Sequence, residues 1–252
     1  MPALPEVIQT AAPLLLAHVI ADFLLQSDRM IERKTRPATL ALHAGLVLLT
    51  AALLLAPTTQ EGTIALAILT VTHAAIDRIK LHFGDTLRPY LIDQAAHLLT
   101  IAAIALVTPT LWSDSLWTAL TETSPLTTAM LWLAGFIAAV TAGGHAVAKL
   151  MAPYHAFWTR RRILGGGLKD AGKMIGQLER GLTYLLVLAG LPSGVAFLIA
   201  AKSILRFNAT KDDRHVAEYV IIGTLASIGW ALLTALCVTA LTASLEIAAA
   251  NP

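Results

Sequence analysis

The chain has 252 residues, of which 56% are hydrophobic and only 13% are charged. A soluble globular protein has about 45–50% apolar and about 25% charged residues, so this composition excludes an ordinary soluble domain. The high hydrophobicity also excludes a disordered chain. The formal net charge of +2 gives no indication of a nucleic-acid partner, and the single cysteine, Cys237, excludes an internal disulfide framework and a cysteine-rich metal site. The composition therefore predicts an all-α integral membrane protein of bacterial type.

Six stretches are long and apolar enough to cross a membrane as helices, which takes about 20 residues each. We expect these spans at 9–27, 38–56, 62–80, 91–111, 126–150 and 218–245. A further apolar stretch, 181–205, is interrupted by the sequence Gly-Leu-Pro-Ser-Gly at 190–194. Neither an internal repeat nor a Pro- or Ser-rich linker is visible, so residues 1–252 are expected to form a single membrane domain, a polytopic helix bundle.

Basic residues alternate between successive loops, and this alternation predicts the orientation of the spans. They gather in the first, third and fifth loops, at 29–36, 78–88 and 155–178, whereas the second and fourth loops carry only acidic charges. Positively charged loops stay in the cytoplasm, so the N-terminus is expected outside, in the bacterial inner (cytoplasmic) membrane. The segment 155–178 is interpreted as a basic cytoplasmic connector.

The basic residues that follow position 205 conflict with this alternation if 181–205 is a single span. A re-entrant helical hairpin that enters from the cytoplasm and turns at Pro192 keeps them on the cytoplasmic side. Such a hairpin has to be buried in protein, because non-helical backbone is not tolerated in contact with lipid. We expect this hairpin; the alternative is a Pro-kinked seventh span followed by an atypical basic loop outside.

Three pairs of aspartate and histidine lie four residues apart inside the predicted spans. They are His18 with Asp22, His73 with Asp77, and Asp93 with His97. Residues at this spacing share one helix face. The order is reversed in the fourth span, which runs in the opposite direction, so every pair places its aspartate nearer the cytoplasm. His43 enters the second span near the same depth, and four antiparallel helices can direct all seven side chains at one point.

Imidazole and carboxylate groups together are typical ligands for zinc, manganese or iron. We therefore expect one or two divalent ions, zinc or manganese first, with ligands drawn from His18, Asp22, His43, His73, Asp77, Asp93 and His97. A cation also resolves the cost of burying carboxylates. Two alternatives remain open, namely a proton relay as in transporters, and a set of local structural hydrogen bonds.

Basic residues near the same face are expected to bind an anionic head group, because lysine and arginine are natural phosphate partners. These residues are Lys80, Lys202 and Arg206. Glu179 either pairs with Arg206 or completes the metal shell. The alternative is that the basic side chains only extend to the membrane interface.

Several segments resemble a family of bacterial membrane proteins known as domain of unknown function 3307. They include His-Ala-Ala-Ile-Asp at 73–77, Asp-Gln-Ala-Ala-His at 93–97 and Ile-Gly-Gln-Leu-Glu-Arg at 175–180, with further similarity at 18–26, 200–207 and 218–224. The resemblance covers most of the chain except the fourth loop and both termini. It implies an inner-membrane protein but no established activity. The first half also distantly resembles membrane-bound metal-dependent hydrolases.

From these residues we expect a divalent-metal-dependent hydrolase that acts on a lipid or a lipid-linked anionic substrate from the cytoplasmic side. The metal would activate a water molecule and polarise the scissile group, and one of Asp22, Asp77 and Asp93 would act as general base. The expected partner is therefore a membrane lipid. Two other functions remain open, a metal or proton transporter that uses the same groups, and a structural protein whose bundle is fixed by the metal.

Overall fold

The computed structural model describes residues 2–120, 123–160, 171–207 and 214–250. This part of the chain is almost entirely helical, and its only strand-like pairing is an isolated bridge between Pro57 and Ser115. The predicted all-α class is therefore confirmed. Among the described residues, six helices are long and apolar enough to cross a membrane: Leu4–Leu25, Pro37–Leu55, Gln60–Lys80, Leu87–Val107, Pro125–Tyr154 and Ala217–Ala250. They correspond to the six predicted spans, so the chain is a polytopic membrane helix bundle.

The chain divides into two compact units. Unit 1 comprises Met1–Ile137 and Ala240–Pro252, and unit 2 comprises Ala138–Thr239. The long helix α11 (Arg214–Ala250) contributes to both units.

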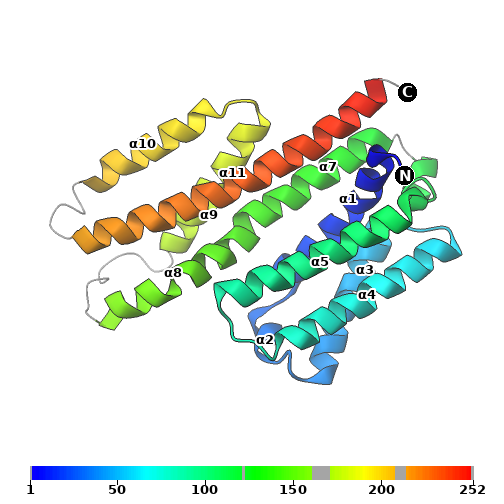
Figure 1. The fold of residues 1–252 in the computed structure, drawn as a ribbon, viewed down its shortest axis with the longest axis horizontal. Coiled ribbons are helices and arrows are strands. Elements are labelled where there is room, and N and C mark those ends of the chain that lie inside the picture. The colour runs from blue at the N-terminus through cyan, green and yellow to red at the C-terminus, as the bar shows by residue number, and fades with distance from the viewer. Residues whose placement is uncertain (1, 121–122, 161–170, 208–213, 251–252) are drawn as a thin grey trace. The chain divides into compact units, whose positions relative to one another are not determined.

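Unit 1 is built around its first helix, which is drawn in dark blue in Figure 1. Its elements are α1 (Leu4–Ile20), the π-helical η1 (Ala21–Leu25), α2 (Asp28–Glu32), α3 (Pro37–Leu55), α4 (Gln60–Lys80), α5 (Leu87–Val107), η2 (Pro109–Leu111), α6 (Leu116–Leu120) and α7 (Thr123–Ile137). Helix α1 packs against α3, α5 and α7, while α4 packs between α3 and α5. The span formed by α1 and η1 is accordingly 56% buried, against 28–33% for the spans of α3, α4 and α5.

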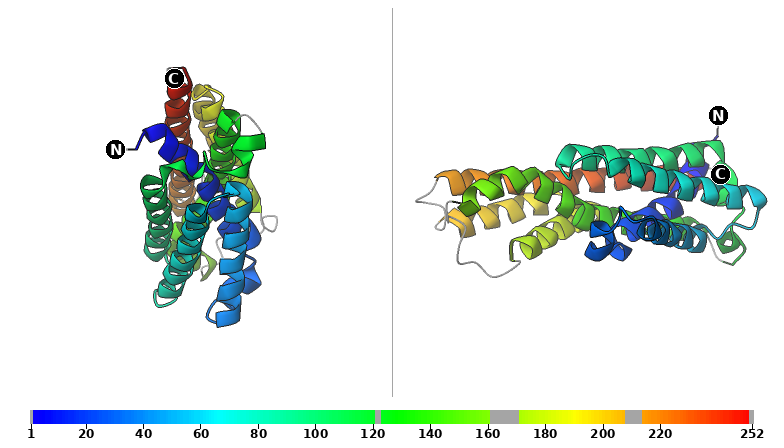
Figure 2. Two further views of the ribbon diagram at one scale, coloured as in Figure 1. Left: turned by 90° about the vertical axis from the view of Figure 1, so that its right-hand side faces the viewer. Right: turned by 90° about the horizontal axis from the view of Figure 1, so that it is seen from below.

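The ends of these helices follow from local chemistry. A proline in the first turn starts α1 and α3, where the missing N–H costs no hydrogen bond. The side chain of Thr59 accepts a hydrogen bond from the backbone N–H of Gly62 and caps α4. Helix α3 stops at Ala56, which has a left-handed φ of 45°. Short connections thus make α3, α4 and α5 an antiparallel series, visible from two sides in Figure 2.

The two ends of unit 1 differ in construction. At one end the connection after α3 is joined to the segment before α6, since Thr58 N donates to Asp114 O at 3.2 Å and Leu116 N donates to Ala56 O at 2.9 Å. Trp117 Nε1 adds a hydrogen bond to Leu53 O at 3.1 Å. The opposite end carries the connections 26–36 and 81–86. The seven predicted ligands lie near this second end.

Unit 2 contains a helical hairpin where the sequence is interrupted at 190–194. Its elements are η3 (Ala138–Ala142), α8 (Gly143–Arg160), α9 (Ala171–Leu188), α10 (Ser193–Phe207) and the first part of α11. Helices α9 and α10 pack against each other, and the turn between them uses Gly190, which has a left-handed φ of 73°. The stretch 181–205 is therefore two packed helices and not one kinked helix. Whether the hairpin re-enters the membrane stays a prediction.

The predicted connector 155–178 is partly helical. Helix α8 continues to Arg160 and α9 already begins at Ala171, so helices occupy both ends of the range that the sequence indicated as a loop. Residues 161–170 lie outside the described residues. The first arm of the hairpin, α9, therefore has 18 residues. The apolar stretch alone suggests an arm of about 11 residues.

A buried arginine organises the interior of unit 2. Arg180 Nε and Nη2 donate to the backbone oxygen of Val140 at 3.1 and 2.9 Å, and Nη1 donates to Ser227 Oγ at 3.2 Å. The acceptor lies in the π-helical segment η3, whose irregular backbone leaves carbonyl groups free for side chains. A Cβ atom on Gly144 would lie only 2.9 Å from Arg180 Nη2, so the glycine makes room for the guanidinium.

Candidate metal centre

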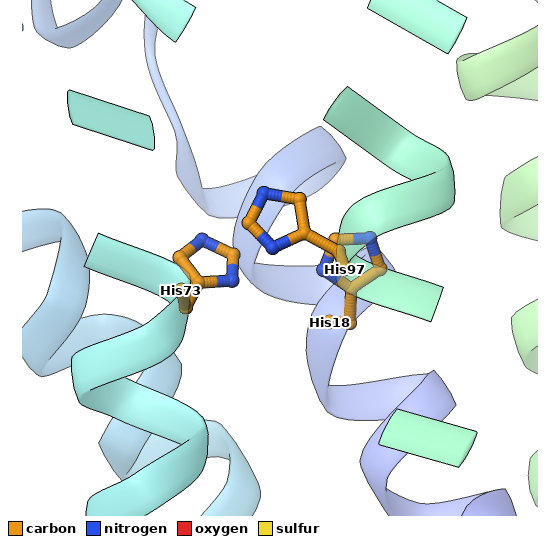
Figure 3. A group of neighbouring side chains, drawn as sticks. All are labelled: His18, His73 and His97. Atoms are coloured by element: carbon orange, nitrogen blue, oxygen red, sulfur yellow. The ribbon is translucent and has the colours of Figure 1, made fainter. Parts of the chain in front are cut away.

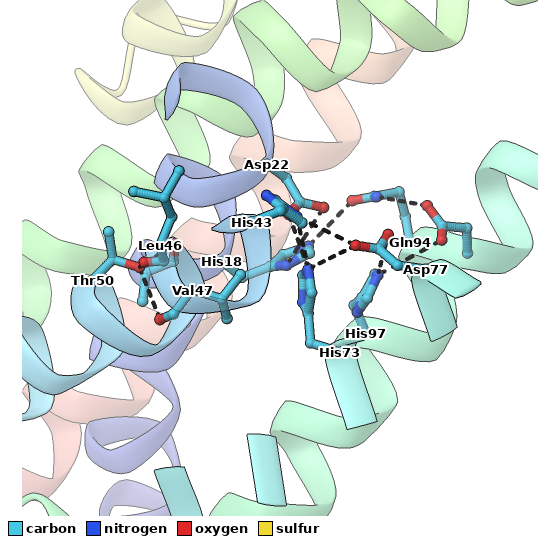
Figure 4. Close-up of polar contacts among 12 residues, drawn as sticks. His18, Asp22, His43, Leu46, Val47, Thr50, His73, Asp77, Gln94 and His97 are labelled. Carbon is cyan, nitrogen blue, oxygen red and sulfur yellow. Dashed lines mark hydrogen bonds and ion pairs between the residues drawn. The ribbon is translucent and has the colours of Figure 1, made fainter. Parts of the chain in front are cut away.

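The seven predicted ligands form one buried cluster in unit 1. The cluster draws on four helical segments, and none of its side chains is more than 7% exposed. Figure 4 shows most of these side chains pointing toward one another. Helix α1 with η1 provides His18 and Asp22, α3 provides His43, α4 provides His73 and Asp77, and α5 provides Asp93 and His97. The Asp–His pairs that are spaced four residues apart in the sequence thus lie together in the fold.

Four ligand atoms from three of these segments lie close to one another. They are Asp22 Oδ1, His43 Nε2, His73 Nε2 and Asp77 Oδ2. The two nitrogens lie 3.1 Å apart, Asp22 Oδ1 lies 3.2 and 3.3 Å from them, and Asp77 Oδ2 lies 3.3 and 3.5 Å from them. A tetrahedral zinc ion with bonds of about 2.0–2.1 Å has ligands separated by about 3.3–3.4 Å. Asp22 Oδ1, His43 Nε2 and His73 Nε2, which lie 3.1–3.3 Å apart, therefore fit three positions of a tetrahedral divalent ion, and Asp77 Oδ2 lies beside the two nitrogens as a further ligand.

Unsatisfied polar atoms at the same point support this fit. Asp22 Oδ1 and Asp77 Oδ2 are buried, and although they lie within 3.5 Å of the ring nitrogens of His43 and His73, none of these contacts has the geometry of a hydrogen bond. Buried polar atoms are rarely left in this condition, because burial without a partner is costly. The facing nitrogens of His43 and His73 share at most one proton in a direct hydrogen bond when both rings are neutral. A cation between the four atoms would satisfy all of them at once.

The position of Asp22 depends on a π-helical turn. Its oxygen Oδ1 faces α3 and α4, while Oδ2 stays 3.9 Å from the Nδ1 atom of His18 one turn earlier. Asp22 lies in η1, a π-helical turn, whose hydrogen bonds span five residues where those of an α-helix span four. Such turns occur frequently at functional sites. The regular i, i+4 reasoning from sequence therefore identified the residue but missed the local irregularity that carries it.

A second set of ligand atoms lies next to the first. Asp77 Oδ1 and Asp93 Oδ1 lie 3.9 and 3.6 Å from His97 Nε2. Asp93 Oδ1 and His97 Nε2 are also buried without a hydrogen-bond partner among the described residues. Asp77 thus presents one oxygen to each set. The other oxygen of Asp93 is satisfied, since Oδ2 accepts from Lys80 Nζ at 2.6 Å and from Gln94 Nε2 at 3.2 Å.

Two lysines neutralise part of the negative charge. Lys34 Nζ lies 2.7 Å from Asp77 Oδ1, and its side chain is only 10% exposed. Lys80, whose side chain is 30% exposed, pairs with Asp93. The sequence indicated Lys34 only as a positive charge in the first loop, because nothing in its local pattern connects it to a residue of the third span. Lys80 was expected to bind substrate, and the structure pairs it with a predicted ligand.

His18 lies at the edge of the cluster. Its Nε2 atom contacts Gln94 Oε1 at 3.2 Å, and its ring centroid lies 5.0 Å from that of His97. His73 and His97 stack with their centroids 4.0 Å apart, and Figure 3 shows the three rings together. A small cavity beside these rings has room for about one water molecule. Gln94 is a further polar contact that the sequence pattern did not indicate.

The other predicted substrate-binding residues belong to unit 2. Glu179 Oε1 and Lys202 Nζ form an ion pair at 2.5 Å between α9 and α10. The sequence left two partners open for Glu179, Arg206 and the metal shell, and the structure pairs it with Lys202. The side chain of Arg206 lies outside the described residues. Its predicted role stays a prediction.

The sequence of the segment that holds the cluster matches a known family. Residues 11–126 match the model of the family described as protein of unknown function (DUF3307). All seven predicted ligands, together with Lys34 and Lys80, lie inside the DUF3307 match, whereas the similar motifs at 175–180, 200–207 and 218–224 lie beyond it. Comparisons with curated proteins and with solved structures found no match.

Proposed function

We propose that this protein is a membrane-embedded hydrolase of the bacterial inner membrane that depends on a divalent metal, zinc or manganese. Its substrate is a lipid or a lipid-linked anionic compound that reaches the site from the cytoplasmic side. The observation that carries the proposal is that the carboxylate oxygens of Asp22 and Asp77 lie buried beside the ring nitrogens of His43 and His73 without a hydrogen bond of good geometry. Intramembrane ionisable residues in such a number are costly and are usually functional.

A divalent ion held by these four groups would supply Lewis-acid polarisation of the substrate and activation of water. The protein's own general base is Asp93, as long as the second set of ligand atoms holds no ion. Its Oδ2 atom is held by Lys80 and Gln94, which leaves Oδ1 buried and free to accept a proton from water. His97 Nε2, 3.6 Å from that oxygen, is placed to orient the water or to pass the proton on.

The shape of the site supports entry from the end of unit 1 that carries the connections 26–36 and 81–86. The cavity on the apolar side, lined by His18, His73, His97 and apolar residues, has room for only about one water molecule. A substrate with a head group cannot enter there. Lys80 is the most exposed charged group of the cluster and lies near the end of α4, where it can contact the negative charge of a head group.

The experiment that tests this function begins with lipid analysis of a deletion strain. Complementation with the wild-type gene should remove any lipid that accumulates, whereas complementation with Asp77→Asn or Asp93→Asn should not. The purified protein should then cleave that lipid, with Asp93→Asn losing turnover while it retains the first metal ion. Glu61→Gln changes an exposed carboxylate at the opposite end of unit 1 and is the matched control.

Two outcomes would contradict the hydrolase. One is that no lipid changes in the deletion strain and the purified protein cleaves none of the strain's extracted lipids. The other is that protein reconstituted in liposomes moves divalent metal or protons in an Asp77-dependent way, which would replace the hydrolase by a transporter.

A further inference from the structure

We propose that the centre contains a second cation site, formed by Asp77 Oδ1, Asp93 Oδ1 and His97 Nε2, and that Lys34 keeps this site closed until a metal ion displaces its ammonium group. This inference rests on the proposed function, because it regulates the same centre. It adds a residue outside the predicted ligand set and predicts how many ions the centre holds.

The second site consists of ligand atoms of the cluster that do not belong to the first set. Asp77 directs Oδ2 to the first set and Oδ1 to the second, in the manner of a bridging carboxylate. Asp93 Oδ1 and His97 Nε2 are at least nine-tenths buried and have no hydrogen-bond partner in the described part of the chain. Three protein ligands leave a coordination position open.

Lys34 stands where a second cation would bind. Its Nζ atom lies 2.7 Å from Asp77 Oδ1, the oxygen that the second site would share with the first. An ammonium group and a divalent ion at one carboxylate oxygen repel each other, so the two compete. With neutral histidines, the three aspartates and the two lysines give the metal-free cluster a net charge of −1. A single divalent ion already makes the net charge of the cluster positive. A second ion would therefore bind with difficulty while Lys34 remains.

The position of Lys34 in the chain allows it to leave. It follows the short helix α2 in the connection to α3, and its neighbour Arg33 is exposed. A lysine has a flexible four-carbon stem, and near a helix end its charge can extend to the membrane interface. Displacement of the ammonium group therefore needs rotation of one side chain and no movement of a membrane-spanning helix.

Lys80 provides the matched comparison. It also neutralises an aspartate of the second site, but it binds Asp93 through Oδ2 and leaves the proposed ligand atom Oδ1 free. Removing either lysine deletes one positive charge near the second site. Only the removal of Lys34 also frees a ligand atom. The two variants thus separate competition for a ligand from a general electrostatic effect.

The test is a Mn²⁺ titration of the full chain, purified in detergent and stripped of metal, followed by electron paramagnetic resonance. Wild type should bind one ion tightly and a second one weakly, with magnetic coupling between the two ions when both are bound. Lys34→Met should tighten the second step by about 10- to 100-fold, as expected for loss of a charged hydrogen bond, and leave the first step unchanged. Lys34→Gln keeps a polar group and provides a second variant should the methionine variant fold poorly.

The comparison variants decide the outcome. Lys80→Met should tighten the second step clearly less than Lys34→Met, and Arg33→Met should not change it. Equal shifts for both lysine variants, or a second ion that binds to none of the variants, would overturn the inference. Such results would leave the proposed function standing as long as the first ion binds. If no ion binds to any variant, the proposed function fails as well.

Discussion

The Nε2 atoms of His43 and His73 lie 3.1 Å apart, and each also lies within 3.5 Å of one oxygen of Asp22 and one of Asp77. Two imidazole nitrogens and two carboxylate oxygens are donor groups that bind zinc or manganese in proteins. The four groups come from three helical segments of unit 1.

His73→Ala should lower the affinity for divalent metal by about 100-fold or more, because a four-ligand site of this kind gains about 10–16 kcal/mol from all its ligands together. Competition with a chromophoric chelator measures the affinity. His82→Ala is the control, since His82 is an exposed histidine just beyond the same helix, and its Nδ1 atom contacts the backbone oxygen of Ile79. Equal loss of affinity in both variants would argue against a specific site.

The ion pair between Lys34 and Asp77 should be measurable in metal-free protein. A double-mutant cycle with Lys34→Met and Asp77→Asn should give a coupling free energy of about 1–3 kcal/mol, because the hydrogen bond is charged and largely buried. Thermal unfolding in detergent provides the four stabilities. If the effects of the two substitutions simply add, Lys34 does not hold Asp77 and the proposed competition loses its basis.

The interior of unit 2 predicts a contrast between two glycines. A Cβ atom on Gly143 would lie 2.4 Å from Trp230 Cδ1, so Gly143→Ala should destabilise the protein by about 1–3 kcal/mol through overpacking. Gly229 is exposed and has open space around it, so Gly229→Ala should be neutral or stabilising, by up to about 1 kcal/mol. Thermal unfolding of the two variants tests this, and similar stabilities would contradict the packing described.

The orientation can be tested by cysteine labelling in a Cys237→Ser background. A cysteine at position 84 should react from the cytoplasm, and one at position 61 only from outside, because positive charge marks the cytoplasmic loops. A cysteine at 211, which lies outside the described residues, should also react from the cytoplasm if the hairpin re-enters. Labelling of 211 only from outside would restore a seventh span.

The sequence predicted the spans and the ligand pairs for physical reasons. Long apolar stretches have few ways to bury their backbone in lipid other than as helices, and residues four apart share a helix face. The structure accordingly has six helices at the expected places in its described part and brings His18, His73 and His97 together in unit 1.

What the sequence did not reveal depends on tertiary contacts or on local irregularity. The contact between Lys34 and Asp77 joins a loop to a distant helix, and no spacing rule connects them. Gln94 is uncharged, so a pattern of ionisable residues does not predict its role, yet it contacts both His18 and Asp93. The π-helical turn around Asp22 has no sequence signature of its own, since it depends on packing against α3 and α4.

Metal analysis of the purified full chain tests the central claim most directly. Protein prepared in detergent without chelators should contain one tightly bound divalent ion per chain, and Asp22→Asn should lose it while Glu61→Gln retains it. Both variants remove a carboxylate charge, but only Asp22 lies beside His43 and His73. Wild-type protein that carries no stoichiometric metal and binds none tightly when zinc or manganese is added would contradict the metal centre.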